Sequence, residues 1–201
     1  MNTLPDSYKW LTELRGLPNT IRYSLDMFGV QEVVGRGSNA TIIAWRDELN
    51  DAAPAGKPIV SGYSDDDIAW CGLFAAIICY RRLKRIEEVV KEPLWARNWL
   101  RYGQEVATRR GAKLSYKDGR VPSLGDVLVF ERGSGGHVGF YVGEDDYYYH
   151  VLGGNQSNKV CIVRIEKSRC LGVRRPPYAI VPRSAKPFRL AAKGTVSTNE
   201  A

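Results

Sequence analysis

The pattern of hydrophobic and polar positions divides the chain into an N-terminal part of helices and a C-terminal part of short strands. Apolar residues at helical spacing predict a short helix over 6–14 and a longer one over 39–49. A nearly continuous apolar run predicts a buried helix over 70–83. A further helix is expected over 94–110, because a proline precedes this segment and a glycine follows it.

Beyond residue 111 the apolar segments become short and are separated by turn residues. This pattern is typical of strands, and the predicted strands cover 126–130, 137–142, 147–152, 159–165, 172–174 and 178–181. Helices followed by a meander of strands indicate an α+β domain with a mostly antiparallel sheet. We therefore expect N-terminal helices packed on a sheet of about five to six short strands.

The expected domain organisation is one main domain over 35–182, preceded by a helical extension over 1–34 and followed by a basic flexible tail over 183–201. The chain has 201 residues, 44% of them hydrophobic and 25% charged, which is typical of a single soluble domain. Its apolar runs are shorter than the roughly 20 residues that a membrane-spanning helix needs. We expect a monomer.

The charge balance favours anionic partners. Lysine and arginine number 29 against 22 acidic residues, a net charge of +7, which promotes encounters with an anionic cell envelope. No nucleic-acid-binding motif accompanies the basic residues, so no specific nucleic-acid partner is expected. The N-terminus lacks the basic start and apolar core of a secretion signal, so we expect synthesis in the cytoplasm without a signal peptide.

The four cysteines show no metal-ligand spacing, and only two histidines accompany them. We therefore predict free thiols, no metal site and no cofactor. Cys71 follows three aspartates and Trp70 at the expected first turn of a helix, where backbone N–H groups and the helix dipole stabilise a thiolate. The same N–H groups can bind a developing oxyanion. Cys79, on the same helix, is instead expected to be a core residue.

Two further positions fit the chemistry of a thiol nucleophile. His137 begins a predicted strand after a glycine-rich turn, and a neutral imidazole there can accept the thiol proton. His150 is the alternative base, since it is the other histidine of the chain. Asn155 follows two glycines at the end of the next strand, where its amide either orients the imidazole or belongs to a turn.

Taken together, Trp70-Cys71 and the segments 122–130, 136–141 and 152–156 resemble the successive blocks of NlpC and CHAP-type cysteine amidohydrolases. The resemblance extends over about 35–177 and is closest to a subfamily of phage lysin-like peptidoglycan hydrolases. It implies a papain-like fold and cleavage of an amide bond in the peptidoglycan stem peptide. By motif position it implies Cys71 as nucleophile, His137 as base and Asn155 as the polar third member of the site. Substrate contacts are expected from Tyr63, Trp70 and Gln156.

The expected function is therefore that of a phage lysin or related cell-wall lytic enzyme, acting at the cell wall or in the periplasm after release or injection. Two alternatives remain. One is a catalytically inactive structural or binding protein of a phage particle, although the presence of all three candidate catalytic residues argues against it. The other is a thiol amidase toxin that acts on another substrate.

Overall fold

The computed structural model describes residues 3–197. This range contains four α-helices, five short 3-10 helices and seven strands. The α-helices are α1 (Trp10–Glu13), α2 (Asn19–Asp26), α3 (Ala40–Asp51) and α4 (Cys71–Leu83). The 3-10 helices are η1 (Asp6–Tyr8), η2 (Ile86–Glu88), η3 (Ala96–Arg101), η4 (Lys117–Gly119) and η5 (Lys167–Arg169). The strands are β1 (Gln104–Arg110), β2 (Lys113–Tyr116), β3 (Val127–Arg132), β4 (Gly135–Glu144), β5 (Tyr148–Gln156), β6 (Lys159–Glu166) and β7 (Cys170–Arg175).

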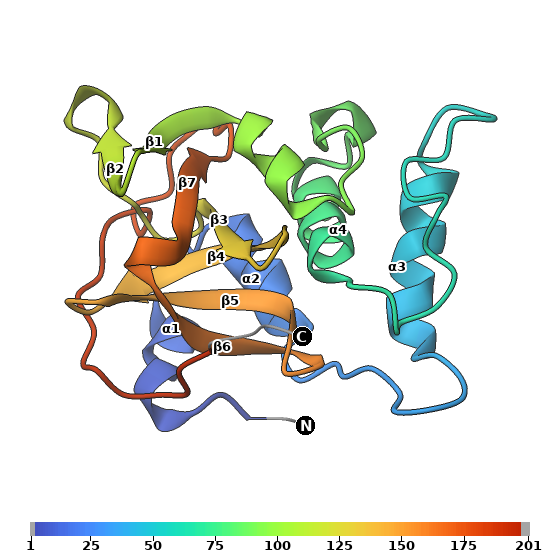
Figure 1. Cartoon of the computed structure of the whole chain (residues 1–201), viewed down its shortest axis with the longest axis horizontal. Helices are drawn as coiled ribbons and strands as arrows, with labels where there is room; N and C mark the ends of the chain where they lie inside the picture. Colours follow the sequence, from blue (N-terminus) through green and yellow to red (C-terminus); the bar gives the residue numbers. More distant parts are fainter. Residues whose placement is uncertain (1–2, 198–201) are drawn as a thin grey trace.

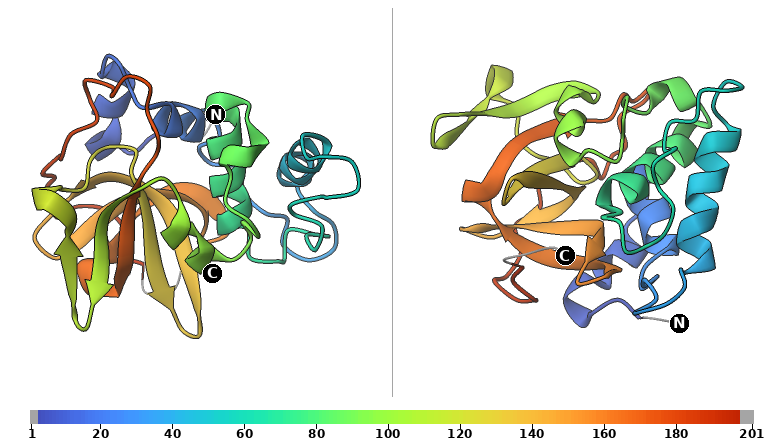
Figure 2. Two further views of the ribbon diagram at one scale, coloured as in Figure 1. Left: turned by 90° about the horizontal axis from the view of Figure 1, so that it is seen from above. Right: turned by 45° about the vertical axis from the view of Figure 1, so that its right-hand side comes forward.

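All seven strands form one sheet in the order β2-β1-β7-β3-β4-β5-β6, and each described pair of neighbours is antiparallel. The sheet is strongly curved, and the helices gather on one side of it (Figures 1 and 2). This arrangement confirms the predicted α+β class and is consistent with a papain-like fold. The sheet has one or two strands more than expected.

Helix α4 is the central element of the helical layer. It packs against β4 and β5, and α3 packs against it in turn (Figure 1). Every residue from Cys71 to Cys79 is buried, because the helix lies between α3 and the sheet and needs apolar residues on all sides. Lys84 ends it in the left-handed conformation, with φ of 55°. A core cluster fills the space between helices and sheet, and a second occupies the other face of the sheet.

The expected helix over 94–110 is wrong. Only η3 is helical, and the chain then enters β1. Gly103, at φ of +46°, separates the two elements, and a Cβ there would lie 2.1 Å from the carbonyl oxygen of Arg175. The glycine at position 111 also has positive φ, but it forms the turn between β1 and β2 and does not end a helix. The expected strand over 178–181 is wrong as well, and α2 was not predicted.

The described part of the C-terminal segment, expected to be a flexible tail, packs against the sheet. Glu144 donates its backbone N–H to Phe188 and accepts one from Leu190, each at 2.9 Å. The ring of Phe188 also lies 4.7 Å from that of Trp10, so residues from both ends of the chain meet here. The boundaries at 34 and 182 stay predictions.

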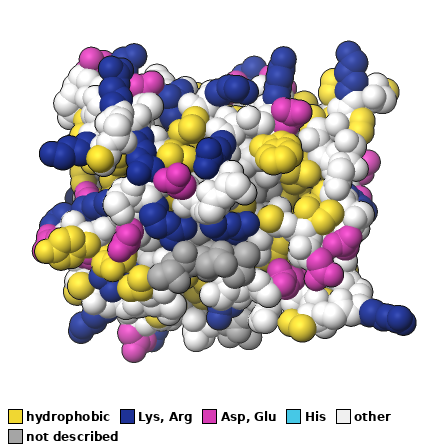
Figure 3. Space-filling view, viewed as in Figure 1, with side chains coloured by type: hydrophobic (Ala, Val, Ile, Leu, Met, Phe, Trp, Pro, Cys, Tyr) yellow, Lys and Arg dark blue, Asp and Glu magenta, His cyan; other side chains and the backbone are white. Residues whose placement is uncertain are grey.

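The described helices are all too short or too polar to cross a membrane. On the face shown in Figure 3, lysine and arginine side chains are spread among acidic and apolar ones and do not form one continuous basic patch.

Candidate active site

Cys71 is the first residue of α4, as predicted. Trp70 occupies the N-cap position without a side-chain hydrogen bond to the helix. Asp66, one of the three aspartates before it, is fully buried, and its Oδ2 accepts the backbone N–H groups of Val33 at 3.0 Å and Asn39 at 2.7 Å. The carboxylate therefore anchors the loop before α3. A negative charge on Cys71 would therefore be stabilised by the backbone N–H groups at the start of α4.

The Cys71 thiol lies against the strand that carries His137. Burial raises the pKa of the thiol, while the charge of Arg132 and the backbone groups of Val138, Gly72 and Cys71 itself act to lower that pKa. Val138 directly follows His137 on β4. The fold thus brings the helix start next to the histidine, although the two lie far apart in the sequence. Only 3% of the Cys71 surface is exposed, so its protonated thiol form is favoured.

His137 is fully buried near the start of β4, directly opposite Phe130 on β3. Its Nε2 lies 3.1 Å from Oε1 of Gln156. The Gln156 amide nitrogen donates to the carbonyl oxygens of Cys161 at 2.6 Å and Val151 at 3.2 Å, which fixes the orientation of the amide. Oε1 can only accept, so His137 carries its proton on Nε2 and its lone pair on Nδ1 in the neutral ring.

The amide that hydrogen-bonds Nε2 of the imidazole therefore belongs to Gln156, one residue beyond Asn155, and the predicted role of Asn155 stays a prediction. A β-bulge explains the difference. The register of β5 against β6 shifts between Gly153 and Gln156, and Asn155 has a left-handed φ of 55°. The extra residue breaks the alternation of side chains along the strand and turns Gln156 onto the face of His137. Asn155 is buried beside it, at 4% exposure.

Two glycines at this bulge allow close approach of neighbouring elements to β5. A Cβ on Gly154 would lie 2.6 Å from Cβ of Phe74 and 2.6 Å from Cζ3 of Trp70, so a side chain here would push α4 away from the strand. A Cβ on Gly153 would lie 2.9 Å from Oε1 of Gln156 and 3.4 Å from Nε2 of His137. The absence of side chains at these two positions thus leaves room for α4 at Gly154 and for the imidazole and Gln156 at Gly153.

Trp70 and Tyr63, which were expected to contact substrate, are core residues in this structure. Trp70 is fully buried, its indole N–H donates to Glu32 at 3.0 Å, and its ring lies 6.1 Å from that of Trp45. Tyr63 is 1% exposed, and its hydroxyl is buried without a hydrogen-bond partner among residues 3–197. Burial raises the pKa of this phenol. The predicted contact of both residues with substrate stays a prediction.

His150, the alternative base, takes part in a buried polar cluster. Its Nε2 lies 3.2 Å from Oδ2 of Asp145, and its Nδ1 accepts the hydroxyl of Tyr8 at 2.6 Å. Arg164 donates to the same carboxylate oxygen at 2.8 Å. Burial lowers the pKa of His150. These contacts join β5 to the N-terminal segment, and they indicate that His150 stabilises the fold.

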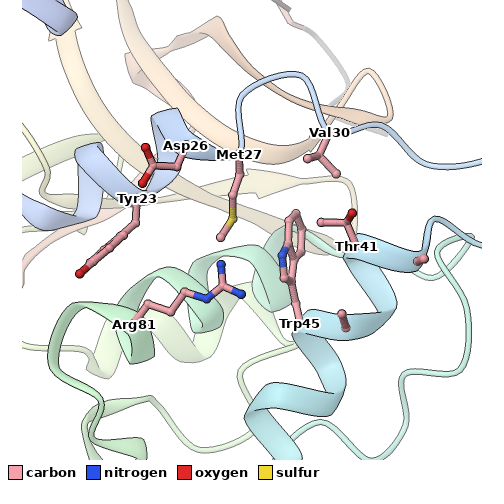
Figure 4. Close-up of a pocket in the computed structure, with 9 residues that line it drawn as sticks. Tyr23, Asp26, Met27, Val30, Thr41, Trp45 and Arg81 are labelled. Carbon is pink, nitrogen blue, oxygen red and sulfur yellow. The ribbon is translucent and has the colours of Figure 1, made fainter. Parts of the chain in front are cut away.

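A cavity of about 490 Å³ lies between α2, α3 and α4, away from Cys71. Figure 4 shows the side chains of Tyr23, Met27, Trp45 and Arg81 around it. Arg81 lies ten residues beyond Cys71 on α4, a distance of about 15 Å along the helix axis. The cavity is thus separate from the candidate active site.

The described residues contain no group of three or more histidine, cysteine or acidic side chains that could hold a metal ion. All four cysteines are free and buried. Burial raises the pKa of Cys79 to about 12, so this thiol stays protonated. Its place in the core is the one expected from its position on the helix.

A helix that begins at a cysteine and packs on a strand bearing a histidine defines a candidate thiol hydrolase site. Residues 63–155 match the family model of the CHAP domain. This match confirms, over that part of the chain, the resemblance to the NlpC and CHAP-type cysteine amidohydrolase superfamily. Such domains act in general as amidases or peptidases on peptidoglycan. No curated protein and no solved structure matches the chain.

Proposed function

We propose that this protein is a cysteine-dependent peptidoglycan hydrolase that cleaves an amide bond of the stem peptide, as a phage lysin or a related cell-wall lytic enzyme. The observation that carries the proposal is the position of the Cys71 thiol against Val138, directly beside His137. The hydrogen bond from His137 to Gln156 supports it, because it leaves the lone pair of the imidazole on Nδ1. We propose Cys71, His137 and Gln156 as the acting residues.

The reaction begins with proton transfer. His137 takes the proton of the Cys71 thiol on Nδ1, and the sulfur attacks the carbonyl carbon of the scissile amide. The negative charge that develops on the carbonyl oxygen is stabilised by backbone N–H groups at the start of α4, including that of Cys71. Gln156 holds the ring through Nε2 while it is positively charged.

The second half of the reaction restores the enzyme. His137 returns its proton to the leaving nitrogen as the carbon–nitrogen bond breaks, which leaves an acyl group on the Cys71 sulfur. His137 then takes a proton from water, whose oxygen attacks the thioester carbonyl. Collapse of this intermediate releases the carboxylic acid product and the sulfur, which recovers its proton from the imidazolium.

Digestion of purified sacculi tests the proposal. The wild-type protein is expected to release soluble fragments, and mass spectrometry of their new termini identifies the cleaved bond. Cys71→Ser is expected to reduce the rate by a factor of about 10³ or more, because a serine hydroxyl is far less ionised than a thiol at neutral pH.

Cys79→Ser is the matched control, since it makes the same exchange at a buried position two turns further along α4. It is expected to lower stability and leave the rate per folded molecule nearly unchanged. If the wild-type protein released no new termini from sacculi, the proposed function would be wrong. A Cys71→Ser variant with most of the wild-type rate would disprove the assignment of the nucleophile alone.

A further inference from the structure

One wall of the candidate site is formed by the segment 93–97. Gly72, the second residue of α4, has no room for a side chain, because a Cβ there would lie 2.2 Å from the carbonyl oxygen of Pro93. At the other end of the segment, a Cβ on Gly136 would lie 3.2 Å from Cγ of Arg97. The segment therefore runs from the residue after Cys71 to the residue before His137.

This wall carries a large exposed aromatic side chain. Trp95 is 70% exposed, whereas the tryptophans at positions 45, 70 and 99 are buried. An aromatic ring held open to solvent on a segment that touches both ends of a catalytic pair is well placed to pack against a substrate. The sequence alone does not single out this tryptophan, because its position depends on how the segment folds against α4 and β4.

Arg132 lies at the same site on the opposing strand. It ends β3 and pairs with Gly135, two residues beyond the pair formed by Phe130 and His137. Its Nη1 is buried and has no hydrogen-bond partner within the described part of the chain. The charge of Arg132 acts on the Cys71 thiol, so the guanidinium lies within electrostatic reach of the sulfur. Arg97 approaches the same point and donates to the carbonyl oxygen of Gly135 at 2.9 Å.

A buried guanidinium N–H without a partner is an unfavourable state that a bound anion relieves. The planar guanidinium matches a carboxylate, with which it forms two parallel hydrogen bonds. Stem peptides offer two such groups, namely the free α-carboxylate of a glutamyl residue linked through its side chain and the C-terminal carboxylate.

We propose that Arg132 is a specificity-determining residue that binds a free carboxylate of the stem peptide beside Cys71, while Trp95 packs against the neighbouring part of the substrate. The inference rests on the proposed function. It adds to it the chemical class of the preferred substrate, an acidic stem peptide with its carboxylate close to the scissile amide.

Three synthetic stem peptides test the inference. The first carries both carboxylates, the second has the glutamyl α-carboxylate replaced by a carboxamide, and the third has a C-terminal amide. We expect one of the two amidated peptides to show a kcat/KM about 10- to 100-fold below that of the first, as the loss of a charge-assisted hydrogen bond implies. The peptide that loses activity identifies which carboxylate Arg132 binds.

In Arg132→Gln the ratio of kcat/KM between the acid and amide peptides is expected to fall to nearly one, because the preference for the acid depends on the guanidinium. Arg132→Lys keeps the charge without the planar fork and is expected to retain part of the preference. Arg110→Gln removes the same charge from an exposed position on β1 and is expected to keep the full wild-type ratio. Ratios within one variant do not depend on its folded fraction.

Each outcome has a separate meaning. If Arg132→Gln lowered kcat/KM for all three peptides equally and kept the ratio between acid and amide, Arg132 would act on the Cys71 thiol and not bind the substrate. The inference would then be wrong. Equal cleavage of all three peptides by the wild-type protein would also overturn it, while leaving the proposed function intact. Cleavage of none of them, together with intact sacculi, would refute the proposed function and this inference with it.

Discussion

The assignment of the third site residue to Gln156 makes a sharp prediction. Gln156→Leu keeps the approximate size of the side chain and removes its hydrogen bonds to His137 Nε2 and to the carbonyl oxygens of Cys161 and Val151, together with a longer contact to the Cys161 sulfur. Each buried polar group left without a partner costs about 1–3 kcal/mol. With partial rearrangement of the bulge, we expect the free energy of unfolding to fall by about 2–5 kcal/mol.

The catalytic effect of Gln156→Leu has a separate physical origin. During turnover the imidazole becomes a cation, and a hydrogen bond to a charged group is worth about 1.5–3 kcal/mol. Loss of this bond in the transition state corresponds to a decrease in kcat/KM of roughly 10- to 150-fold, at about 1.4 kcal/mol for each factor of ten. Gln156→Glu keeps an acceptor for Nε2 but loses the two donors, so we expect a smaller catalytic loss together with reduced stability.

The control is Asn155→Gly, which removes the neighbouring amide and tolerates the positive φ of that position. We expect it to keep kcat/KM within about twofold of wild type, because the amide that hydrogen-bonds Nε2 of the imidazole is that of Gln156. Rates are measured on one soluble stem peptide and divided by the folded fraction from urea unfolding. A Gln156→Leu variant with wild-type kcat/KM, alongside a large loss in Asn155→Gly, would refute this reasoning and restore Asn155 as the third residue.

Two further predictions concern residues around the site. Because burial lowers the pKa of His150, the unfolded chain binds more protons than the folded one below about pH 6.5. Urea titrations should show that lowering the pH through this range costs the wild-type protein more stability than it costs His150→Gln. An equal loss in both proteins would contradict the lowered pKa of His150. Gly154→Ala should lower the free energy of unfolding by about 1–3 kcal/mol and reduce activity, since its Cβ would overlap Phe74 and Trp70. At Gly135 an added Cβ would meet only one carbonyl oxygen, at 3.6 Å, so Gly135→Ala should leave the free energy of unfolding measured in urea nearly unchanged.

The sequence predicts those parts of the fold in which the local residue pattern is compatible with only one kind of secondary structure. The apolar run after Trp70 is too long for a strand and too uniform for a surface helix, so a buried helix was its natural interpretation, and the structure has α4 there. The segment 94–110 lacked such a constraint. Its turn at Gly103 is fixed by the carbonyl of Arg175, a contact from the far end of the chain that no local pattern reveals.

The same limit applies to the site. Cys71 and His137 could be proposed because each stands at the start of a recognisable element. The role of Gln156 could not, since side-chain alternation along β5 favours Asn155 and only the bulge reverses it. Arg132 was missed for a different reason. The role proposed for it rests on its pairing across the β3–β4 hairpin and on a buried N–H that has no partner among residues 3–197, and neither is visible before the strands are aligned.

Burial of the candidate nucleophile determines how the site must work. Burial disfavours a thiolate at the Cys71 position, although the charge of Arg132 and nearby backbone groups act in the opposite direction. An imidazolium beside the thiolate would stabilise it further, because attraction between close opposite charges is stronger where water is excluded. In the proposed mechanism we therefore expect the proton to move from Cys71 to His137 as the sulfur attacks, without a stable thiolate beforehand. Catalysis by this route would depend on the orientation of the imidazole, which the Gln156 amide holds at Nε2.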